Sequence, residues 1–449
     1  MKKLRFGIFE NPQANDSGTS TWRYEGNERV NFESLEYWEN LAKICEDAGL
    51  DFLFLADAWG WSEVNGERPD VALTEGLDIP RLDPAVVASA IAAKTDKLGV
   101  VITGSTLLER PYYFARKLAS LDHLSKGRIG WNIVTTGTAE TAVKAFGMQM
   151  VEHDKRYDMA DDFVNVCYNL WEGAWEPDAF VRDKNGVFAD PNKVHEVSYE
   201  GPYFKSQGYG NTSYSPQGTP TLFQAGTSPR GRRFGGKHGE CIFLGGSSVE
   251  QLREQVSAIR EEAVKSGRAA DSVKTMAALP CVVAPTREEA EQKYRDIVAS
   301  QNPDVAVASY AMFTGLDLSS YDRDTPMTSL HTELSQSQIS RFEGQTVGDV
   351  LDAWAAHGVR GDAVVGSPTE VADRICELAE GADLDGFLIT PLVQPGSTQD
   401  FIEYVLPILR ERGVAAEGYE EDTLRERLLG TDSPHLRDDH PGAGYRKNA

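Results

Sequence analysis

Short apolar segments alternate with helical segments along this chain, and the alternation limits the folds that it can adopt. The stretches between the short segments carry apolar residues at helical spacing, for example at Leu35, Trp38 and Leu41. Strands separated by helices pair in parallel through right-handed crossovers. Eight short segments have the composition of such strands: residues 4–9, 51–56, 98–105, 128–135, 219–225, 240–244, 274–283 and 385–390. The sequence therefore predicts an α/β protein, a (β/α)8 TIM barrel rather than an open sheet.

Two stretches interrupt this rhythm. Residues of about 176–218 are rich in Asp, Asn, Gly and Pro, and residues of about 301–366 hold weak helical patterns between the last two predicted strands. We expect both insertions to lie over the C-terminal mouth of the barrel, where they would act as lids. The charged tail from about residue 417 is expected to wrap a neighbouring surface or to be partly mobile. The chain as a whole, residues 1–449, is predicted to form a single barrel domain.

Composition excludes several classes of function. The net charge of −24, without a basic stripe, argues against a nucleic acid or an anionic membrane as partner. The five cysteines show no CxxC spacing and the eight histidines show no HxxxH or HxH, so we expect reduced, buried thiols and no metal site. No apolar stretch is long enough to cross a membrane, and none follows Met1-Lys2-Lys3 as a signal peptide would. A cytoplasmic location is predicted.

Hydrogen-bonding groups follow three of the predicted strands. The run Trp131-Asn132-Ile133-Val134-Thr135-Thr136 ends a strand in an amide and two hydroxyls. Asp57 follows a wholly apolar strand, where its carboxylate either accepts from a ligand or caps the next helix. Thr103-Gly104 ends another strand, where glycine allows either the close approach of a flat ring or a β-bulge. The carboxyl ends of parallel strands are where α/β proteins hold ligands.

Two predicted helix starts carry groups suited to an anion. His153 and Tyr157 lie four residues apart at the start of one helix, where backbone N–H groups and the helix dipole attract negative charge. The turn Gln224-Ala225-Gly226-Thr227-Ser228 leads from a strand into a second helix, with Ser228 as its N-cap. Thr227 and Ser228 would cradle a phosphate there. A surface pair and an empty helix cap are the structural alternatives.

These motifs and their order along the chain resemble those of the flavin-dependent monooxygenases of the bacterial-luciferase-like superfamily. The most similar branch holds nitrilotriacetate, dibenzothiophene-sulfone and long-chain alkane monooxygenases, and the resemblance runs from about Phe6 to the C-terminal tail. Further motifs that carry it are Phe54-Leu55-Ala56-Asp57, Leu170-Trp171-Glu172, Ser215-Pro216-Gln217-Gly218 and Asp385-Gly386-Phe387.

The resemblance implies a two-component enzyme that uses reduced FMN and O2. The chain has no GxGxxG motif, so reduced FMN would come from a separate NAD(P)H:flavin reductase. The family's matching residues lie around the flavin, and the resemblance therefore assigns to FMN the following residues: Asp57, Thr103, Asn132, Thr135, His153, Tyr157, Thr227 and Ser228. The protein would shield the reduced cofactor from water, while no catalytic side chain is assigned.

Aromatic residues in the first two strand-to-helix loops indicate the substrate. Phe9, Trp22, Trp59 and Trp61 either wall the mouth, where they would favour a planar heterocycle broken at a C–S or C–N bond, or simply fill the loops. Gly137 stands where the alkane enzyme carries a histidine, which disfavours alkane hydroxylation.

The sequence leaves three alternative functions open, and it also predicts an oligomeric state. A riboflavin lyase that releases lumichrome needs a tricyclic pocket of the same kind. A deazaflavin (F420)-dependent oxidoreductase and a non-catalytic flavin-binding protein share the fold. A homodimer or homotetramer is expected, because the helix predicted at 112–124 carries more aromatic residues than one buried face needs.

Overall fold

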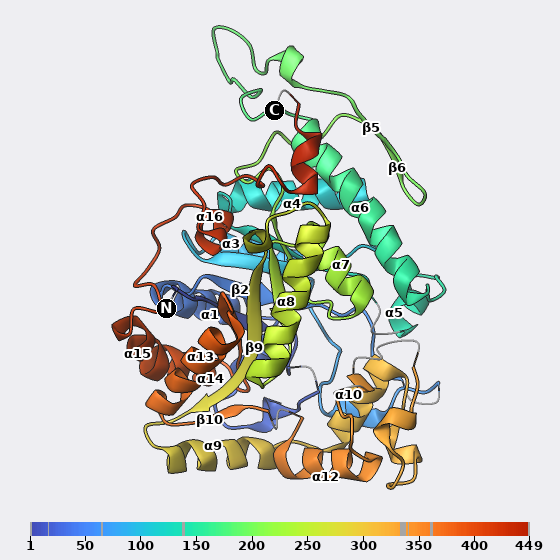
Figure 1. The fold of residues 1–449 in the computed structure, drawn as a ribbon, viewed down its shortest axis with the longest axis vertical. Helices are drawn as coiled ribbons and strands as arrows, with labels where there is room; N and C mark the ends of the chain where they lie inside the picture. The colour runs from blue at the N-terminus through green and yellow to red at the C-terminus, as the bar shows by residue number, and fades with distance from the viewer. Residues whose placement is uncertain are drawn as a thin grey trace.

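The computed structural model contains the predicted closed barrel (Figure 1). The structure describes residues 2–16, 18–63, 66–136, 140–332, 338–339, 341–359 and 362–447. Eight parallel strands form the barrel in the spatial order β9-β11-β1-β2-β3-β4-β7-β8, and pairing of β8 with β9 closes it. Their bounds are β1 Arg5–Glu10, β2 Phe52–Leu55, β3 Gly99–Ser105, β4 Ile129–Val134, β7 Thr221–Gln224, β8 Cys241–Leu244, β9 Lys274–Val283 and β11 Gly386–Thr390. The (β/α)8 prediction is confirmed.

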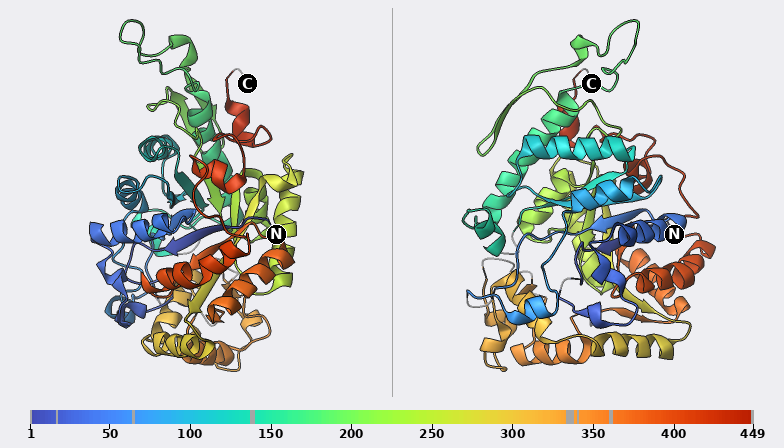
Figure 2. Two further views of the ribbon diagram at one scale, coloured as in Figure 1. Left: turned by 90° about the vertical axis from the view of Figure 1, so that its left-hand side faces the viewer. Right: turned by 180° about the vertical axis from the view of Figure 1, so that it is seen from behind.

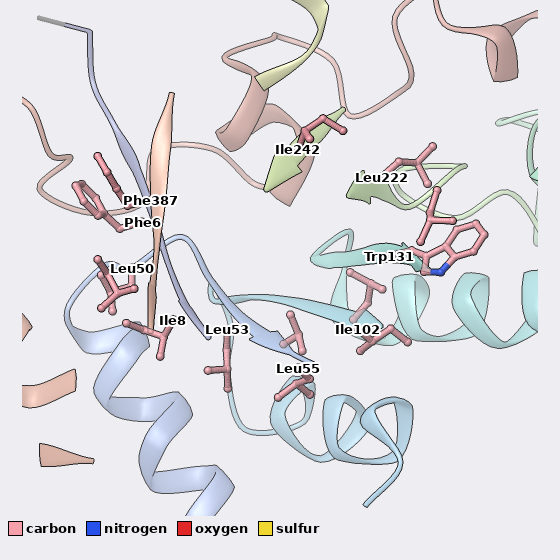
Figure 3. Packing of buried hydrophobic residues seen from close by; sticks show 14 of the residues in the cluster. Phe6, Ile8, Leu50, Leu53, Leu55, Ile102, Trp131, Leu222, Ile242 and Phe387 are labelled. Carbon is pink, nitrogen blue, oxygen red and sulfur yellow. The ribbon is translucent and has the colours of Figure 1, made fainter. Parts of the chain in front are cut away.

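Alternate residues of each strand face two different apolar layers. On β2, Phe52 and Phe54 point into the barrel, where Phe223 and Phe243 meet them. The intervening Leu53, like Trp131 of β4, belongs to the layer between strands and helices (Figure 3). This two-sided burial explains why the strands read as continuous apolar runs.

Helices cover the outside of the barrel. Those that follow its strands are α1 Leu35–Asp47, α3 Pro84–Ala92, α4 Pro111–Ser125, α6 His153–Gly173, α7 Pro229–His238, α8 Val249–Lys265, α9 Arg287–Ala299 and α13 Pro368–Ala382. The shorter α2 Asp70–Thr74 and α5 Glu140–Ala145 lie in the loops after β2 and β4. Beyond β11 the chain continues through α14 Gly396–Asp400, a π-helical turn at Phe401–Val405 and α15 Leu406–Glu411.

The insertion between β9 and β11 lies at the mouth, as predicted. It contains α10 Asp304–Thr314, α12 Val347–His357 and the short strand β10 Val364–Gly366, which pairs in parallel with the end of β9. Apolar residues of α10 pack against α2 of the second loop. Met312 and Phe313 at the end of α10 reach the cavity described below.

The insertion at 176–218 does not lie over the mouth, and that prediction is wrong. It follows α6, which runs back from the mouth, and it precedes β7, so it emerges at the amino ends of the strands. It carries the hairpin β5 Val197–Glu200 and β6 Lys205–Gly208, anchored where Asn169 of α6 donates to the carbonyl of Ser198. Figures 1 and 2 show this hairpin at one end of the molecule and α10 and α12 at the other.

The charged tail packs on the barrel itself. Its helix α16 Leu424–Leu429 places Leu424 and Leu428 in the cluster inside the barrel. Arg425 is fully buried there and forms an ion pair with Glu240 at 2.8 Å. The tail thus closes the end of the barrel opposite the mouth.

Three further features bear on the sequence predictions. Cys45, Cys167, Cys241 and Cys281 are buried, and no cysteine forms a disulfide within the described residues. Among these residues no group of three or more His, Cys, Asp or Glu side chains is placed to hold a metal ion. No described helix is both long and apolar enough to cross a membrane.

Candidate flavin site

A cavity of about 340 Å³ opens at the carboxyl ends of β2, β3, β4 and β7, and we call it the mouth cavity. Seven of the eight residues predicted to bind the cofactor line it: Asp57, Thr103, Thr135, His153, Tyr157, Thr227 and Ser228. The eighth, Asn132, donates from Nδ2 to Oγ1 of Thr103 at 3.1 Å. Its Oδ1 is buried and has no partner among the described residues.

Two helix N-termini converge at one side of the mouth cavity. Ser228 is the N-cap of α7, and its hydroxyl accepts from the backbone N–H of Gly231. His153 begins α6, and its Nε2 lies 3.3 Å from Oγ of Ser228. Unpaired backbone N–H groups and the positive ends of two dipoles therefore face the same point, which suits a phosphate group.

Tyr157 lies between these two helices. Its ring packs edge-on against His153 and at a tilt against Phe234 of α7, with the guanidinium of Arg230 5.5 Å from the ring centre. Burial raises the pKa of the Tyr157 hydroxyl, so the group stays protonated and can donate. Two neighbouring glycines leave room for the Tyr157 hydroxyl: a Cβ on Gly226 would lie 2.5 Å from its oxygen, and a Cβ on Gly231 would lie 2.8 Å from it.

Arg230 does not add a free positive charge to the mouth cavity. Its guanidinium pairs with Asp158 at 2.9 Å and with Asp161 at 2.5 Å. Asp161 also accepts from His238 and Lys237, so this carboxylate joins α6 to α7 behind the phosphate-sized corner. The role of Arg230 is therefore to hold the two helices together.

Arg156 is a site residue that the sequence analysis missed. It lines the mouth cavity and is 2% exposed, and its Nε has no partner among the described residues. One Nη donates to the carbonyl of Val151, and no described carboxylate forms an ion pair with it. A signal was present, because an arginine in the first turn of a helix opposes the dipole unless an anion offsets it.

Asp57 marks the other side of the cavity. Burial raises the pKa of Asp57 to about 6, although the guanidinium of Arg81 lies 3.7 Å away and opposes the shift. Arg81 also donates to the carbonyl of Ala58 and to Gln13, which fixes the loop after β2. A carboxyl with this pKa changes charge near neutral pH.

Thr136, just beyond the end of β4, also lines the mouth cavity. It has φ of +51°, a left-handed conformation that costs a β-branched residue about 1–2 kcal/mol. Its hydroxyl is hydrogen-bonded to that of Ser105, which also lines the cavity. Backbone held in this way is often found at ligand sites.

The four predicted substrate residues are distributed over different places. Trp59 lines the mouth cavity and packs edge-on against Phe146. Phe9 stacks on Phe54 and lines a neighbouring cavity. Trp22 donates to Glu75 and lies beneath the guanidinium of Arg23, away from the lining of the mouth cavity. The backbone of Trp61 is tied to Thr141, and its side chain is not part of that lining. Gly137 lies outside the described residues.

Residues 4–386 match the family model described as luciferase-like monooxygenase. The chain belongs to this family. The resemblance inferred from the motifs is thereby confirmed, and the protein is a flavin-dependent oxidoreductase with the fold of its relatives.

Relatives of known name align over nearly the whole chain. Long-chain alkane monooxygenase of Geobacillus thermodenitrificans (strain NG80-2) is 40% identical over 447 residues, which are 99% of this chain and 98% of that protein. Dimethyl-sulfide monooxygenase of Hyphomicrobium sulfonivorans is 36% identical over 454 residues, 99% of this chain and 94% of that protein.

A solved structure is more similar still. The crystal structure of a riboflavin lyase with modified FMN and substrate riboflavin superposes with a TM-score of 0.97, at 72% identity and covering 100% of both chains.

The residues present in the mouth cavity fit the flavin that the family implies. Arg156 of the lining and Asn132 beside it each offer a buried polar atom that has no partner in the part of the chain that the structure describes, and the N-termini of α6 and α7 meet at one corner. These groups suit a phosphate at one end and a polar ring edge at the other.

Proposed function

We propose that the chain uses reduced FMN and O2 to break the C–N bond between the ring and the side chain of riboflavin, releasing lumichrome. The observation that carries this proposal is 72% identity to a riboflavin lyase over the full length of both chains, against 40% for the alkane monooxygenase. The sequence pointed to a planar heterocycle cleaved at C–N or C–S. Riboflavin is such a molecule, so the identity favours riboflavin lyase over the other functions that the sequence allowed.

The reaction balances as a monooxygenation. One atom of O2 enters at the side-chain carbon that is bonded to the ring nitrogen, and the other leaves as water with the two electrons of reduced FMN. The hydroxylated C–N bond then opens, with the electron pair going to the ring. Lumichrome, ribose and oxidised FMN are the products.

Within this proposal the mouth cavity holds FMN. Ser228, His153, Tyr157 and Arg156 bind the phosphate, since they surround the corner where the two helices begin. The hydroxyl of Thr103, the amide of Asn132 and the carboxyl of Asp57 face the ring. Reduced FMN supplies the electrons for oxygen activation, and a separate NAD(P)H:flavin reductase regenerates it.

Turnover with defined components tests the function. The purified protein, FMN, NADH and a free-standing flavin reductase should convert riboflavin to lumichrome, with one O2 consumed per lumichrome beyond the uncoupled background. Anaerobic samples and samples without reductase should form none. Turnover of an aromatic sulfone or an alkane, but not of riboflavin, would overturn the substrate. No coupled oxygen uptake with any substrate would favour an F420-dependent or non-catalytic flavin protein.

A further inference from the structure

A second cavity, of about 250 Å³, lies beside the mouth cavity, and we call it the aromatic cavity. The residues of its lining that carry the argument are Phe9, Tyr310, Phe313, Arg341, Phe342 and Trp354. They come from β1, from α10, from the segment before α12 and from α12 itself. The insertion at the mouth therefore builds a chamber of its own against the barrel.

Three aromatic rings of the insertion form one wall. The ring centres of Tyr310 and Trp354 lie 5.5 Å apart, those of Phe342 and Trp354 5.8 Å, and those of Tyr310 and Phe342 6.1 Å. Tyr310 and Trp354 are at most 8% exposed, so the apolar cluster of the insertion holds them in place. Rigid, flat walls of this kind favour a planar ring.

Phe313 separates the two cavities. It belongs to the lining of both, and its neighbour Met312 reaches only the mouth cavity. Strand β1 shows the same division: Phe9 faces the aromatic cavity, and Asn11, just beyond its end, lines the mouth cavity. A ring in the aromatic cavity would therefore lie next to a ligand in the mouth cavity.

Polar side chains also line the aromatic cavity, namely those of Ser309, Tyr310, Gln338 and Arg341. The hydroxyl of Tyr310 is buried and has no partner among the described residues, which leaves a donor for a carbonyl group nearby. The charge of Arg341 is offset by Asp362, at 3.3 Å. An uncharged ligand with a carbonyl oxygen suits this lining better than an anion does.

Space also argues for two binding places. At about 340 Å³ the mouth cavity is near the lower limit for a pocket that holds one ligand of drug size, which is about 300 Å³. A reaction between FMN and a second flavin needs room for two tricyclic rings. The aromatic cavity adjoins the mouth cavity at Phe313 and offers the second space.

We propose that the aromatic cavity binds the substrate's planar, uncharged heteroaromatic ring, with Phe313 at the border of the two cavities and the carbon bonded to the ring nitrogen facing the cofactor. This assignment rests on the proposed function for the identity of the substrate. The ring-binding itself depends only on the cavity and can be measured without turnover.

Calorimetric titration of the full-length protein with lumichrome and, separately, with FMN tests the assignment. Lumichrome has the tricyclic ring but neither the side chain nor the phosphate. It should bind with the same affinity when FMN is saturating. Phe342→Ala should weaken lumichrome about two- to tenfold, the loss of one aromatic contact, and should leave FMN unchanged. Tyr310→Phe, which removes only the hydroxyl, should act in the same direction.

Two further variants complete the design. Tyr157→Phe should weaken FMN and leave lumichrome unchanged, while Phe313→Ala should change both affinities, because its side chain lines both cavities. Phe188→Ala is the matched control, since this exposed phenylalanine lies in the 176–218 insertion at the far end.

Competition between lumichrome and FMN for one site, no binding of lumichrome, or equal lumichrome affinity in Phe342→Ala and Phe188→Ala would each overturn the assignment. Binding as expected without conversion of riboflavin would leave the cavity assignment intact and overturn only the proposed function.

Discussion

His153 and Ser228 lie 3.3 Å apart, Nε2 to Oγ, although they open two different helices. The contact brings the N-termini of α6 and α7 to one corner of the mouth cavity. Each helix end contributes unpaired N–H groups, and together they form a stronger site for a dianion than either forms alone.

Replacing Ser228 tests the phosphate site. Ser228→Ala removes one hydrogen bond to a charged group, so the affinity for reduced FMN should fall by about 1–2 kcal/mol. Ser248→Ala is a matched control, because Ser248 caps α8 in the same way, by accepting from Gln251. Both variants should lose about 1 kcal/mol of stability from the missing cap. Equal FMN affinity in the two variants, by anaerobic titration, would remove Ser228 from the site.

Gly226 gives a larger effect for a steric reason. A Cβ there would lie 2.1 Å from Nε2 of Gln224 and 2.5 Å from the hydroxyl of Tyr157. Gly226→Ala should therefore displace Tyr157 and weaken FMN by about 1–3 kcal/mol, the cost of overpacking. Gly245→Ala, where the added Cβ meets nothing within 4 Å, should bind FMN normally. Wild-type affinity in Gly226→Ala would show that Tyr157 does not hold the cofactor.

The carboxyl of Asp57 should make stability depend on pH. Burial raises its pKa in the folded protein to about 6, from 3.8, so folding favours the protonated form. The stability that this provides is complete below pH 3.8 and is lost as the pH rises through 6. Between pH 4 and 7 the wild type should lose unfolding free energy relative to Asp57→Asn, which cannot ionise. A constant difference between wild type and Asp57→Asn would contradict the raised pKa.

Ser228 and Arg156 differ in how far the sequence alone can predict their roles. The Thr-Ser-Pro pattern specifies a helix start locally, so the amino-acid sequence is enough to assign Ser228 as an N-cap. Arg156 matters because no described carboxylate forms an ion pair with it, and such an absence depends on how distant segments pack. Trp22 shows the opposite error: its indole pairs with Glu75, more than fifty residues away. Spacing along the chain does not reveal that contact.

The true position of the insertion at 176–218 could have been predicted from the sequence. Its position was contained in the order of elements, because a loop from a helix to the next strand in a parallel barrel returns to the amino ends of the strands. Only loops that follow strands reach the mouth. Chain direction, taken together with length, assigns the lid to the insertion after β9 alone.

The tail should be essential for stability. Arg425 is fully buried against Glu240, and it also donates to the carbonyl of Thr219. Arg425→Ala leaves the buried carboxylate unpaired and should cost about 3–5 kcal/mol in urea unfolding. Arg437→Ala, which removes a partly exposed ion pair from the same tail, should cost about 1 kcal/mol or less. Similar losses for the two variants would mean that the tail does not close the barrel.

The outer face of α3 and α4 should carry the contact between subunits. Val86, Tyr113 and Leu124 are each more than 60% exposed there and line one surface groove of about 630 Å³. The groove also holds Asp83 and Arg116, so a second copy related by a two-fold axis could pair opposite charges, while Glu109 and Lys117 form an ion pair with each other. We expect a homodimer by light scattering at micromolar concentration. Leu124→Glu should raise the dimer dissociation constant about tenfold or more, because burying one leucine contributes about 1.5–3 kcal/mol. Val187→Glu, an equally drastic change on the far insertion, should leave the dimer intact. A monomeric wild type would contradict both the dimer and this interface.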